Sequence, residues 1–195
     1  MAAASRPPHG SGREAILRAA VQVVADAGLR GLTFRAVGDR AGVNNTLIAH
    51  YFGNREALIE AALEWAVDQS VSETHFEDFA TSPEEFFRQL MESLTDASEL
   101  QIYQYEMILE ARRRPELRPA IRRLYERYED VLDRSLQNIG IVVVDDATRR
   151  ALFGSMDGLV LQRVSGNLTV EEFRDALDRM LGFARLAVQQ PPAEG

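Results

Sequence analysis

The chain has 195 residues, a net charge of −8 and a mean hydropathy of −0.21, which fits a globular protein with a core of its own. It contains no cysteine, so disulfides, thiolate zinc sites and cysteine nucleophiles are excluded. No apolar run approaches the ~20 residues needed to span a membrane, and the stretch before Glu14 lacks the apolar segment of a signal peptide. A cytoplasmic protein without a membrane partner is therefore expected.

Charge is distributed unevenly along the chain. Residues 1–55 carry seven arginines and three acidic residues, a balance of +4. The other 140 residues carry fifteen arginines and 27 acidic residues, a balance of −12, which accounts for the total of −8. A basic N-terminal part joined to an acidic remainder is typical of a protein that binds a polyanion with one end.

The first predicted elements are a leader and one helix. Residues 1–12 are rich in Ala, Ser, Pro and Gly, a composition typical of disorder. Between Arg13 and Ala27, apolar residues recur at helical spacing, and Gly28 is a natural stop. This helix is expected to pack on the elements that follow it.

Residues 33–55 predict two short helices that meet in a tight turn, the helix-turn-helix pattern. Gly42 lies at the corner, where a side chain is expected to obstruct the close crossing of the two helices. Side chains that can accept a backbone N–H bond precede these two helices and the long helix after them. These capping residues are Thr33, Asn44 and Asn54.

Helical spacing continues to the end of the chain and predicts six more helices, about nine in all. Two of them open with capping boxes, at Ser82-Pro83-Glu84-Glu85 and at Thr169-Val170-Glu171-Glu172, and Asp145 or Asp146 caps another. The apolar run 141–144 has β propensity but no second strand to pair with, so we expect a buried linker. The predicted fold is all-α.

The stretch 42–58, G-V-N-N-T-L-I-A-H-Y-F-G-N-R-E-A-L, resembles the DNA-binding signature of TetR-type bacterial regulators, which is close to G-V-S-K-G-T-L-Y-x-Y-F-x-S-K-E-x-L. The resemblance implies a leader (1–12), a helix-turn-helix DNA-binding domain (13–56), a larger helical effector-binding and dimerisation domain (57–190) and a tail (191–195). Four of the departures from the usual residues bear on the base contacts. The chain has Gly38 for Ala, Asn45 for Lys, Leu47 for a small polar residue and Ala49 for Tyr.

The resemblance further implies that the second helix of the motif enters the major groove of double-stranded DNA. Arg35 has the strongest physical case as a base contact, because its guanidinium can hold guanine O6 and N7 together. Pairing of two such heads implies a palindromic operator. The implied DNA-binding residues are Thr33, Arg35, Asn44, Asn45, Thr46, Leu47, Ala49, His50, Tyr51 and Arg55.

In TetR-type proteins the last two helices form a four-helix dimer interface, so a homodimer is implied here. Two glycines and a serine lie in the middle of the penultimate helix, where close approach of backbones is a reason to tolerate them. The alternative is that they pack on a helix of the same chain. The implied interface residues are Leu152, Gly154, Ser155, Gly158, Leu159, Phe173, Leu177, Met180, Leu181 and Ala184.

The middle helices of such proteins enclose a pocket for a small-molecule effector, whose identity the chain does not reveal. An aromatic and Met stripe at helical spacing is otherwise ordinary core. The candidate lining is Phe87, Met91, Tyr103, Glu106, Met107, Tyr125 and Tyr128.

No cofactor, metal or enzyme activity is expected, since nothing resembles a phosphate-binding loop, a nucleophile elbow or a dinucleotide motif. The acidic and His-containing stretch 73–78 is more typical of a solvated surface than of a metal site. The function expected is a sequence-specific DNA-binding transcriptional regulator, a repressor released by its effector. The alternative is a helical ligand-binding or scaffold protein whose head does not read DNA.

Overall fold

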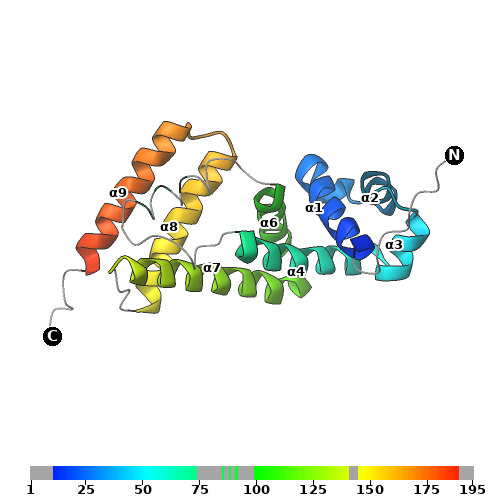
Figure 1. The fold of residues 1–195 in the computed structure, drawn as a ribbon, viewed down its shortest axis with the longest axis horizontal. Helices are drawn as coiled ribbons and strands as arrows, with labels where there is room; N and C mark the ends of the chain where they lie inside the picture. Colours follow the sequence, from blue (N-terminus) through cyan, green and yellow to red (C-terminus); the bar gives the residue numbers. More distant parts are fainter. Residues whose placement is uncertain are drawn as a thin grey trace. The chain divides into compact units, whose positions relative to one another are not determined.

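The computed structural model describes residues 11–73, 85, 88, 91, 99–140 and 145–188 (Figure 1). Within these ranges every regular element is helical, with eight α-helices, one short 3-10 helix and no strand. The all-α prediction is confirmed. Most of the helix expected after Ser82, the run 141–144 and nearly all of the stretch 73–78 lie outside the described residues. No described helix is long and apolar enough to cross a membrane.

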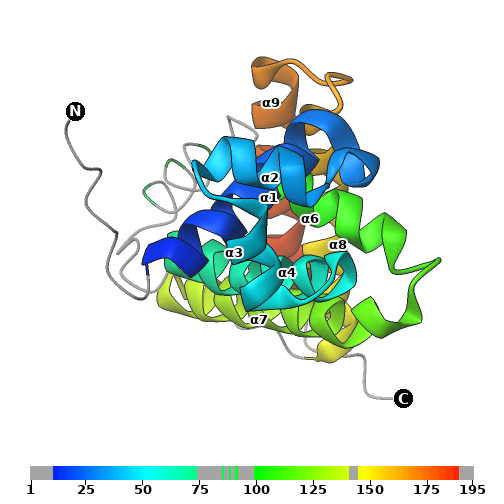
Figure 2. The ribbon, with the colours of Figure 1, turned by 90° about the vertical axis from the view of Figure 1, so that its right-hand side faces the viewer.

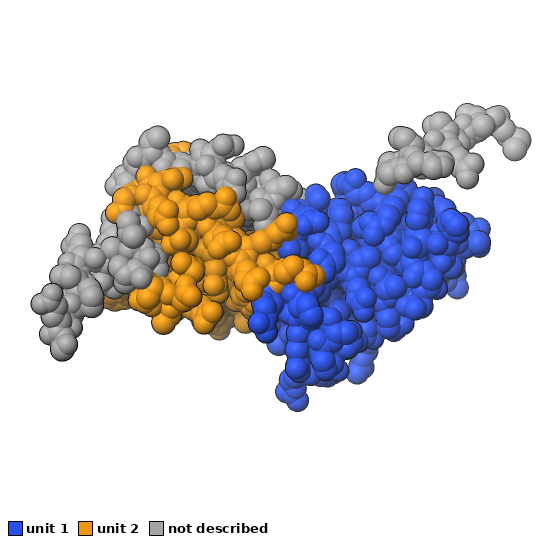
Figure 3. Space-filling model, turned by 90° about the horizontal axis from the view of Figure 1, so that it is seen from below, with its two compact units in different colours: residues 1–70, 98–122 blue, residues 71–97, 123–195 orange. Residues whose placement is uncertain are grey.

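The chain divides into two compact units, coloured separately in Figure 3. Unit 1 comprises residues 1–70 and 98–122, and unit 2 comprises residues 71–97 and 123–195. This division differs from the expected boundary after residue 56, because residues 57–70 and 98–122 pack with the N-terminal helices. The reason is visible in unit 1, where α6 (Glu99–Glu110) lies against α1 (Ser11–Gly31).

Unit 1 is built around α1, which packs against both α6 and α2 (Phe34–Ala41). Next come α3 (Asn45–Phe52), which contacts α2, and the long α4 (Arg55–Glu73). The predicted stop at Gly28 is a kink with φ 67° inside α1, a conformation that glycine adopts without strain. The fully buried side chains of this core include Ile16, Leu17, Val37, Ile48, Leu58, Ile59, Leu63 and Met107.

Unit 2 contains most of α7 (Arg118–Asn138), which follows the short 3-10 helix Pro115–Leu117, together with α8 (Asp146–Val164) and α9 (Val170–Val188). Helices α8 and α9 pack against each other. Asp145 caps α8 by accepting the Thr148 N–H at 2.8 Å, and Thr169 and Glu172 form the predicted capping box. These backbone hydrogen bonds hold the pKa of both carboxyls, Asp145 and Glu172, below their usual values.

Candidate nucleic-acid interface

The two helices of the motif begin at the predicted caps. Thr33 accepts the Ala36 N–H at 3.1 Å, and Asn44 accepts the Thr46 N–H at 2.9 Å. Asn54 does the same for α4 by accepting the Ala57 N–H at 2.9 Å. Because each cap satisfies a donor that the helix itself leaves unpaired, the start of each helix in the motif is set locally by the sequence.

The turn between α2 and α3 depends on two glycines, for different reasons. Gly42 has φ 66°, a left-handed conformation, but a β-carbon there would meet nothing within 4 Å. The expectation that a side chain at position 42 would obstruct the crossing of the helices is therefore wrong. Glycine is favoured there because of its left-handed backbone conformation. The close approach occurs at buried Gly38, where a β-carbon would lie 2.6 Å from Asn45 Oδ1 and 2.9 Å from the Val43 carbonyl oxygen.

Helix α3 buries one side and leaves the other in solvent. Ile48 and Phe52 face the core, whereas Asn45, Thr46, Ala49, His50 and Tyr51 are exposed and Leu47 is half-buried. Figure 2 views unit 1 from the side on which α2 and α3 lie. An amphipathic helix with a polar, solvent-facing side at a helix-turn-helix corner has the form that fits a major groove.

Arg35 projects from the first turn of α2, and 86% of its side-chain surface is exposed. It forms an ion pair with Asp39, one turn further along α2, at 3.9 Å between Nε and Oδ2. An exposed ion pair of this length is weak. The Arg35 guanidinium is therefore available to a base or a phosphate.

Arg55 has a structural role within unit 1. Its Nε donates to the Leu32 carbonyl oxygen at 2.7 Å, and Nη2 donates to the carbonyl oxygen of Leu29. Both acceptors belong to the end of α1 and the residue after it. The guanidinium caps α1 and joins it to α4 through Nε and Nη2, and the expected phosphate contact of Arg55 stays a prediction.

Three neighbouring aromatic rings lie at the end of α3, close to the start of α1. The guanidinium of Arg13 lies over the Phe52 ring, 5.4 Å from its centroid. Tyr51 lies beside both His50 and Phe52, with ring centroids 5.9 and 6.1 Å apart. Arg13 thus brings a further positive charge next to the end of α3, a contribution that spacing within the motif did not reveal.

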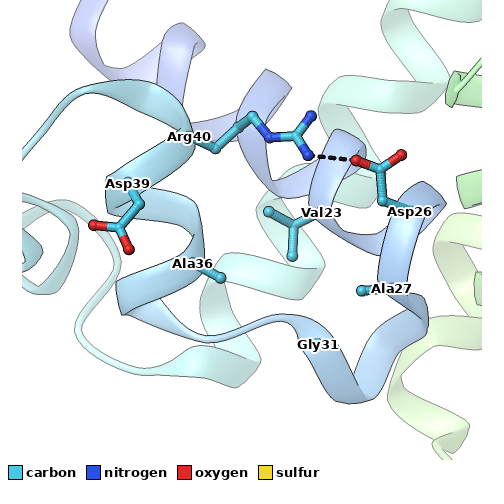
Figure 4. Close-up of a pocket in the computed structure, with 7 residues that line it drawn as sticks. All are labelled: Val23, Asp26, Ala27, Gly31, Ala36, Asp39 and Arg40. Atoms are coloured by element: carbon cyan, nitrogen blue, oxygen red, sulfur yellow. Dashed lines mark hydrogen bonds and ion pairs between the residues drawn. The ribbon is translucent and has the colours of Figure 1, made fainter.

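A shallow open hollow of about 500 Å³ lies between α1 and α2 (Figure 4). Its floor is aliphatic, and an ion pair between Arg40 and Asp26 spans it. None of the described residues among those expected to line an effector pocket borders this hollow. The Arg40–Asp26 pair tethers α2 to α1 and so steadies the helix that carries Arg35.

Comparison with known proteins agrees with this geometry. The family model described as "Bacterial regulatory proteins, tetR family" matches residues 16–62, and "Tetracyclin repressor-like, C-terminal domain" matches residues 77–182, over half of the chain. The chain belongs to the TetR family.

Among curated TetR relatives, HTH-type transcriptional regulator BetI 1 of Chromohalobacter salexigens is 29% identical over 91 residues, which cover 45% of each chain. The match thus spans less than half of that relative. A solved TetR-family member from Streptomyces coelicolor A3 is 30% identical, with a TM-score of 0.65 over 87% of this chain and 97% of that one. The multidrug binding protein EbrR, solved with ethidium, is 26% identical, with a TM-score of 0.63 over 87% and 98%.

The residues expected to line a TetR-type effector pocket are divided between the two units. In unit 1, Tyr103 and Met107 are buried, and the Tyr103 hydroxyl donates to the Ile59 carbonyl oxygen at 3.1 Å. Burial raises the pKa of Tyr103. Glu106 is exposed on α6. These positions make Tyr103 and Met107 part of the core of unit 1.

In unit 2, Met91 is buried and Phe87 lies outside the described residues. Tyr125 and Tyr128 flank Phe153, a residue the sequence had not singled out for the pocket. Phe153 lies edge-on to Tyr125, with ring centroids 5.8 Å apart, and stacks on Tyr128 at 6.0 Å. Burial, the charge of Asp157 and the hydrogen bond that the Tyr125 hydroxyl donates to that carboxylate raise the pKa of Tyr125 to about 12. We name these four residues, Tyr125, Tyr128, Phe153 and Asp157, the aromatic cluster.

The residues expected at the TetR-type dimer interface fall into two groups. Phe173 and Leu177 have no exposed surface in the single chain, so for these two the expectation is wrong, because they form the core of unit 2. Leu181 is also buried, and the side chain of Ala184 is not described. The remaining positions are partly or fully exposed: Leu152, Gly154, Ser155, Gly158, Leu159 and Met180.

Among the described residues, no helix of the same chain packs on the glycines of α8. A β-carbon at Gly154 or Gly158 would meet nothing within 4 Å, and the same holds for Gly182 on α9. Leu161, one turn beyond Gly158, is 47% exposed, and Phe183 is 71% exposed. The α8–α9 pair therefore carries an open surface with two exposed large apolar side chains.

Proposed function

We propose that this protein is a cytoplasmic, homodimeric transcriptional regulator that binds a palindromic operator through α3 and Arg35, as a repressor released by a small organic molecule. The observation that carries the proposal is the exposed side of α3. On this side Thr46, Ala49 and His50 are exposed, and Arg35 of α2 is exposed as well. Both helices of the motif start at side-chain caps. These side-chain types can contact base edges and thymine methyl groups.

Local charge supports binding at this end of the chain. The overall charge of −8 would repel DNA, but the balance of +4 in residues 1–55 lies where the motif lies. Phosphate contacts by arginine provide most of the affinity of such proteins and make it dependent on salt.

The open surface of α8 and α9 supports pairing of two copies. Gly154, Gly158 and Leu161 recur at helical spacing, so they share one side of α8. Small residues allow helix backbones to approach closely, and the exposed Leu161 and Phe183 supply apolar area that a partner copy would bury. A two-fold dimer would set two recognition helices on successive major grooves, ~34–36 Å apart.

The aromatic cluster supports an organic cation as the effector. Aromatic faces and a carboxylate together are the groups that attract such cations, and Tyr125, Tyr128, Phe153 and Asp157 supply both. Ethidium, the molecule in the similar EbrR structure, is a planar organic cation. We propose that a ligand of this class binds at the cluster and shifts the dimer away from its DNA-binding form, typically by 1–3 kcal/mol.

Footprinting of the purified protein on its own upstream DNA at two salt concentrations tests DNA binding. A protected palindrome, with affinity falling steeply as salt rises, supports the proposal. If neither the upstream DNA nor genomic fragments selected by the protein yield a preferred sequence, the protein is instead a helical ligand-binding or scaffold protein.

Titration with ethidium tests the effector class. Saturable binding that is weakened by Asp157→Asn and unaffected by Asp175→Asn, a control at an exposed acid of α9, supports the aromatic cluster as its site. Equal binding by both variants would place the site elsewhere. Release of bound DNA by ethidium then tests the coupling between the two ligands.

A further inference from the structure

Gly38 and Asn45 are in unusually close contact across the turn of the helix-turn-helix motif. The Asn45 amide oxygen lies 2.6 Å from the point that a β-carbon of residue 38 would occupy. Real β-carbons do not tolerate so short a distance, so Asn45 can hold this position only because residue 38 is glycine. Gly38 is buried on α2, and Asn45 is the first residue of α3.

This contact directs the Asn45 amide toward α2. An asparagine that reads adenine must present both its oxygen and its NH₂ group to the base edge, since it accepts from N6 and donates to N7. With Oδ1 against Gly38, Asn45 lacks that arrangement. Asn45 is itself exposed, and the other exposed side chains nearby include Thr46, Ala49, His50 and Arg35.

We propose that Gly38 is a specificity-determining residue of the DNA-binding domain: by leaving room for the Asn45 amide against α2, it holds Asn45 away from the bases as a positioning residue. Base preference is then set by the other exposed residues of α3 and by Arg35. A residue with a β-carbon at position 38 turns Asn45 outward and changes which bases are preferred. This inference rests on the proposed DNA binding.

The Val43 carbonyl oxygen also limits the space for a side chain at position 38. It lies 2.9 Å from the point that a β-carbon there would occupy, and it belongs to the backbone. The Val43 N–H also donates to the Gly38 carbonyl oxygen at 3.0 Å, so the turn is held against α2. Gly38→Ala therefore has two effects. It shifts the turn, which Asn45→Ala cannot reverse, and it displaces Asn45, which Asn45→Ala removes.

The test compares the wild type with Gly38→Ala, Asn45→Ala and the double variant, by selection from a randomised operator library and by thermal unfolding. Asn45→Ala is expected to keep the wild-type consensus and to change affinity by less than about threefold, as for a residue that makes no base contact. Gly38→Ala is expected to alter the consensus in each half-site and to lose at least about fivefold in affinity for the wild-type operator. The double variant is expected to recover the wild-type consensus but not the full wild-type affinity, because the shift of the turn remains.

Gly42→Ala is the matched control, because it strains a left-handed residue in the same turn without meeting any atom. It should lower the unfolding temperature, leave the consensus unchanged and show no coupling to Asn45→Ala. Loss of a base preference in Asn45→Ala alone would overturn the proposal, as would an unchanged consensus in Gly38→Ala.

A wild type that selects no sequence would refute the proposed DNA binding and, with it, the specificity role. The contact itself would still be tested by unfolding, since non-additive changes in the unfolding temperature of the two substitutions are expected only if residue 38 and the Asn45 side chain are in contact.

Discussion

The Arg55 side chain donates through Nε to the backbone oxygen of Leu32, 2.7 Å away and 23 positions earlier in the chain. With its second bond to the carbonyl of Leu29, this guanidinium joins the start of α4 to the end of α1. The helix-turn-helix lies between these two points in sequence. Arg55 therefore connects the helices on either side of the helix-turn-helix by hydrogen bonds.

Arg55→Ala is expected to lower the free energy of unfolding by about 1–3 kcal/mol, because two hydrogen bonds from a charged donor are lost and the Leu32 carbonyl loses its Arg55 partner. Arg35→Ala, the matched control, should change it by no more than about 0.5 kcal/mol, since Arg35 is exposed. Urea unfolding followed by the fluorescence of Trp65 measures both. Equal effects of the two substitutions would contradict the assigned role of Arg55.

Arg35→Ala is expected to weaken operator binding by about 1–3 kcal/mol per recognition helix, if the arginine pairs with guanine. The loss should be largest on the operator base pair that Arg35 contacts. If it instead contacts a phosphate, the loss will be similar for all sequences and the salt dependence will be reduced. Fluorescence anisotropy with wild-type and substituted operators separates the two outcomes.

Leu161→Glu and Phe183→Glu are expected to convert the dimer to monomer, because each places a charge on the open surface of α8 and α9. Leu109→Glu is the control, since Leu109 is 70% exposed but lies on α6, in the other unit. Analytical ultracentrifugation of the three variants gives the oligomeric state. A dimer that survives both α8–α9 substitutions would show that another surface pairs the copies.

The free energy of unfolding is expected to decrease at acid pH, partly because the capping carboxylates of α8 and α9, Asp145 and Glu172, become protonated. The pKa values of Asp145 and Glu172 are lowered in the folded chain by bonds from Thr148 and Thr169. A carboxylate of this kind stabilises the fold above its unfolded pKa, about 4, and the stabilisation is lost as pH falls through the lower folded pKa.

Asp145→Asn and Glu172→Gln preserve the capping geometry but do not titrate. The double variant should therefore show a shallower decline in unfolding free energy between about pH 5 and pH 2.5. Circular dichroism during urea unfolding at several pH values measures this slope. An identical slope in the wild type would show that other groups govern acid unfolding.

Tyr103→Phe is expected to destabilise the protein by about 1 kcal/mol, because it leaves the buried Ile59 carbonyl without the hydroxyl donor. Tyr103→Ala should cost about 3–5 kcal/mol, as for other large buried aromatic residues. The difference between the two variants in urea unfolding isolates the contribution of the ring. A neutral Tyr103→Phe would indicate that water replaces the hydroxyl.

Local features of this fold could be predicted from the sequence because their partners lie within a few residues. The caps at Thr33, Asn44, Asn54 and Asp145 each bind a backbone N–H two or three positions ahead. Helical periodicity likewise needs only neighbouring residues, which is why the all-α class and the helix-turn-helix were correct. The outward side of α3 followed from the same spacing.

The roles of Arg55, Gly38, Phe173 and Leu177 were decided by tertiary structure. Arg55 could reach phosphate or the end of α1, and only the packing of α1 on α4 brings the carbonyls within reach. Gly38 rather than Gly42 meets the facing helix because of how α2 and α3 cross, and apolar residues of α9 fill their own core rather than an interface. Sequence spacing identifies which side of a helix is apolar, whereas the contact made by each residue depends on segments distant in the chain.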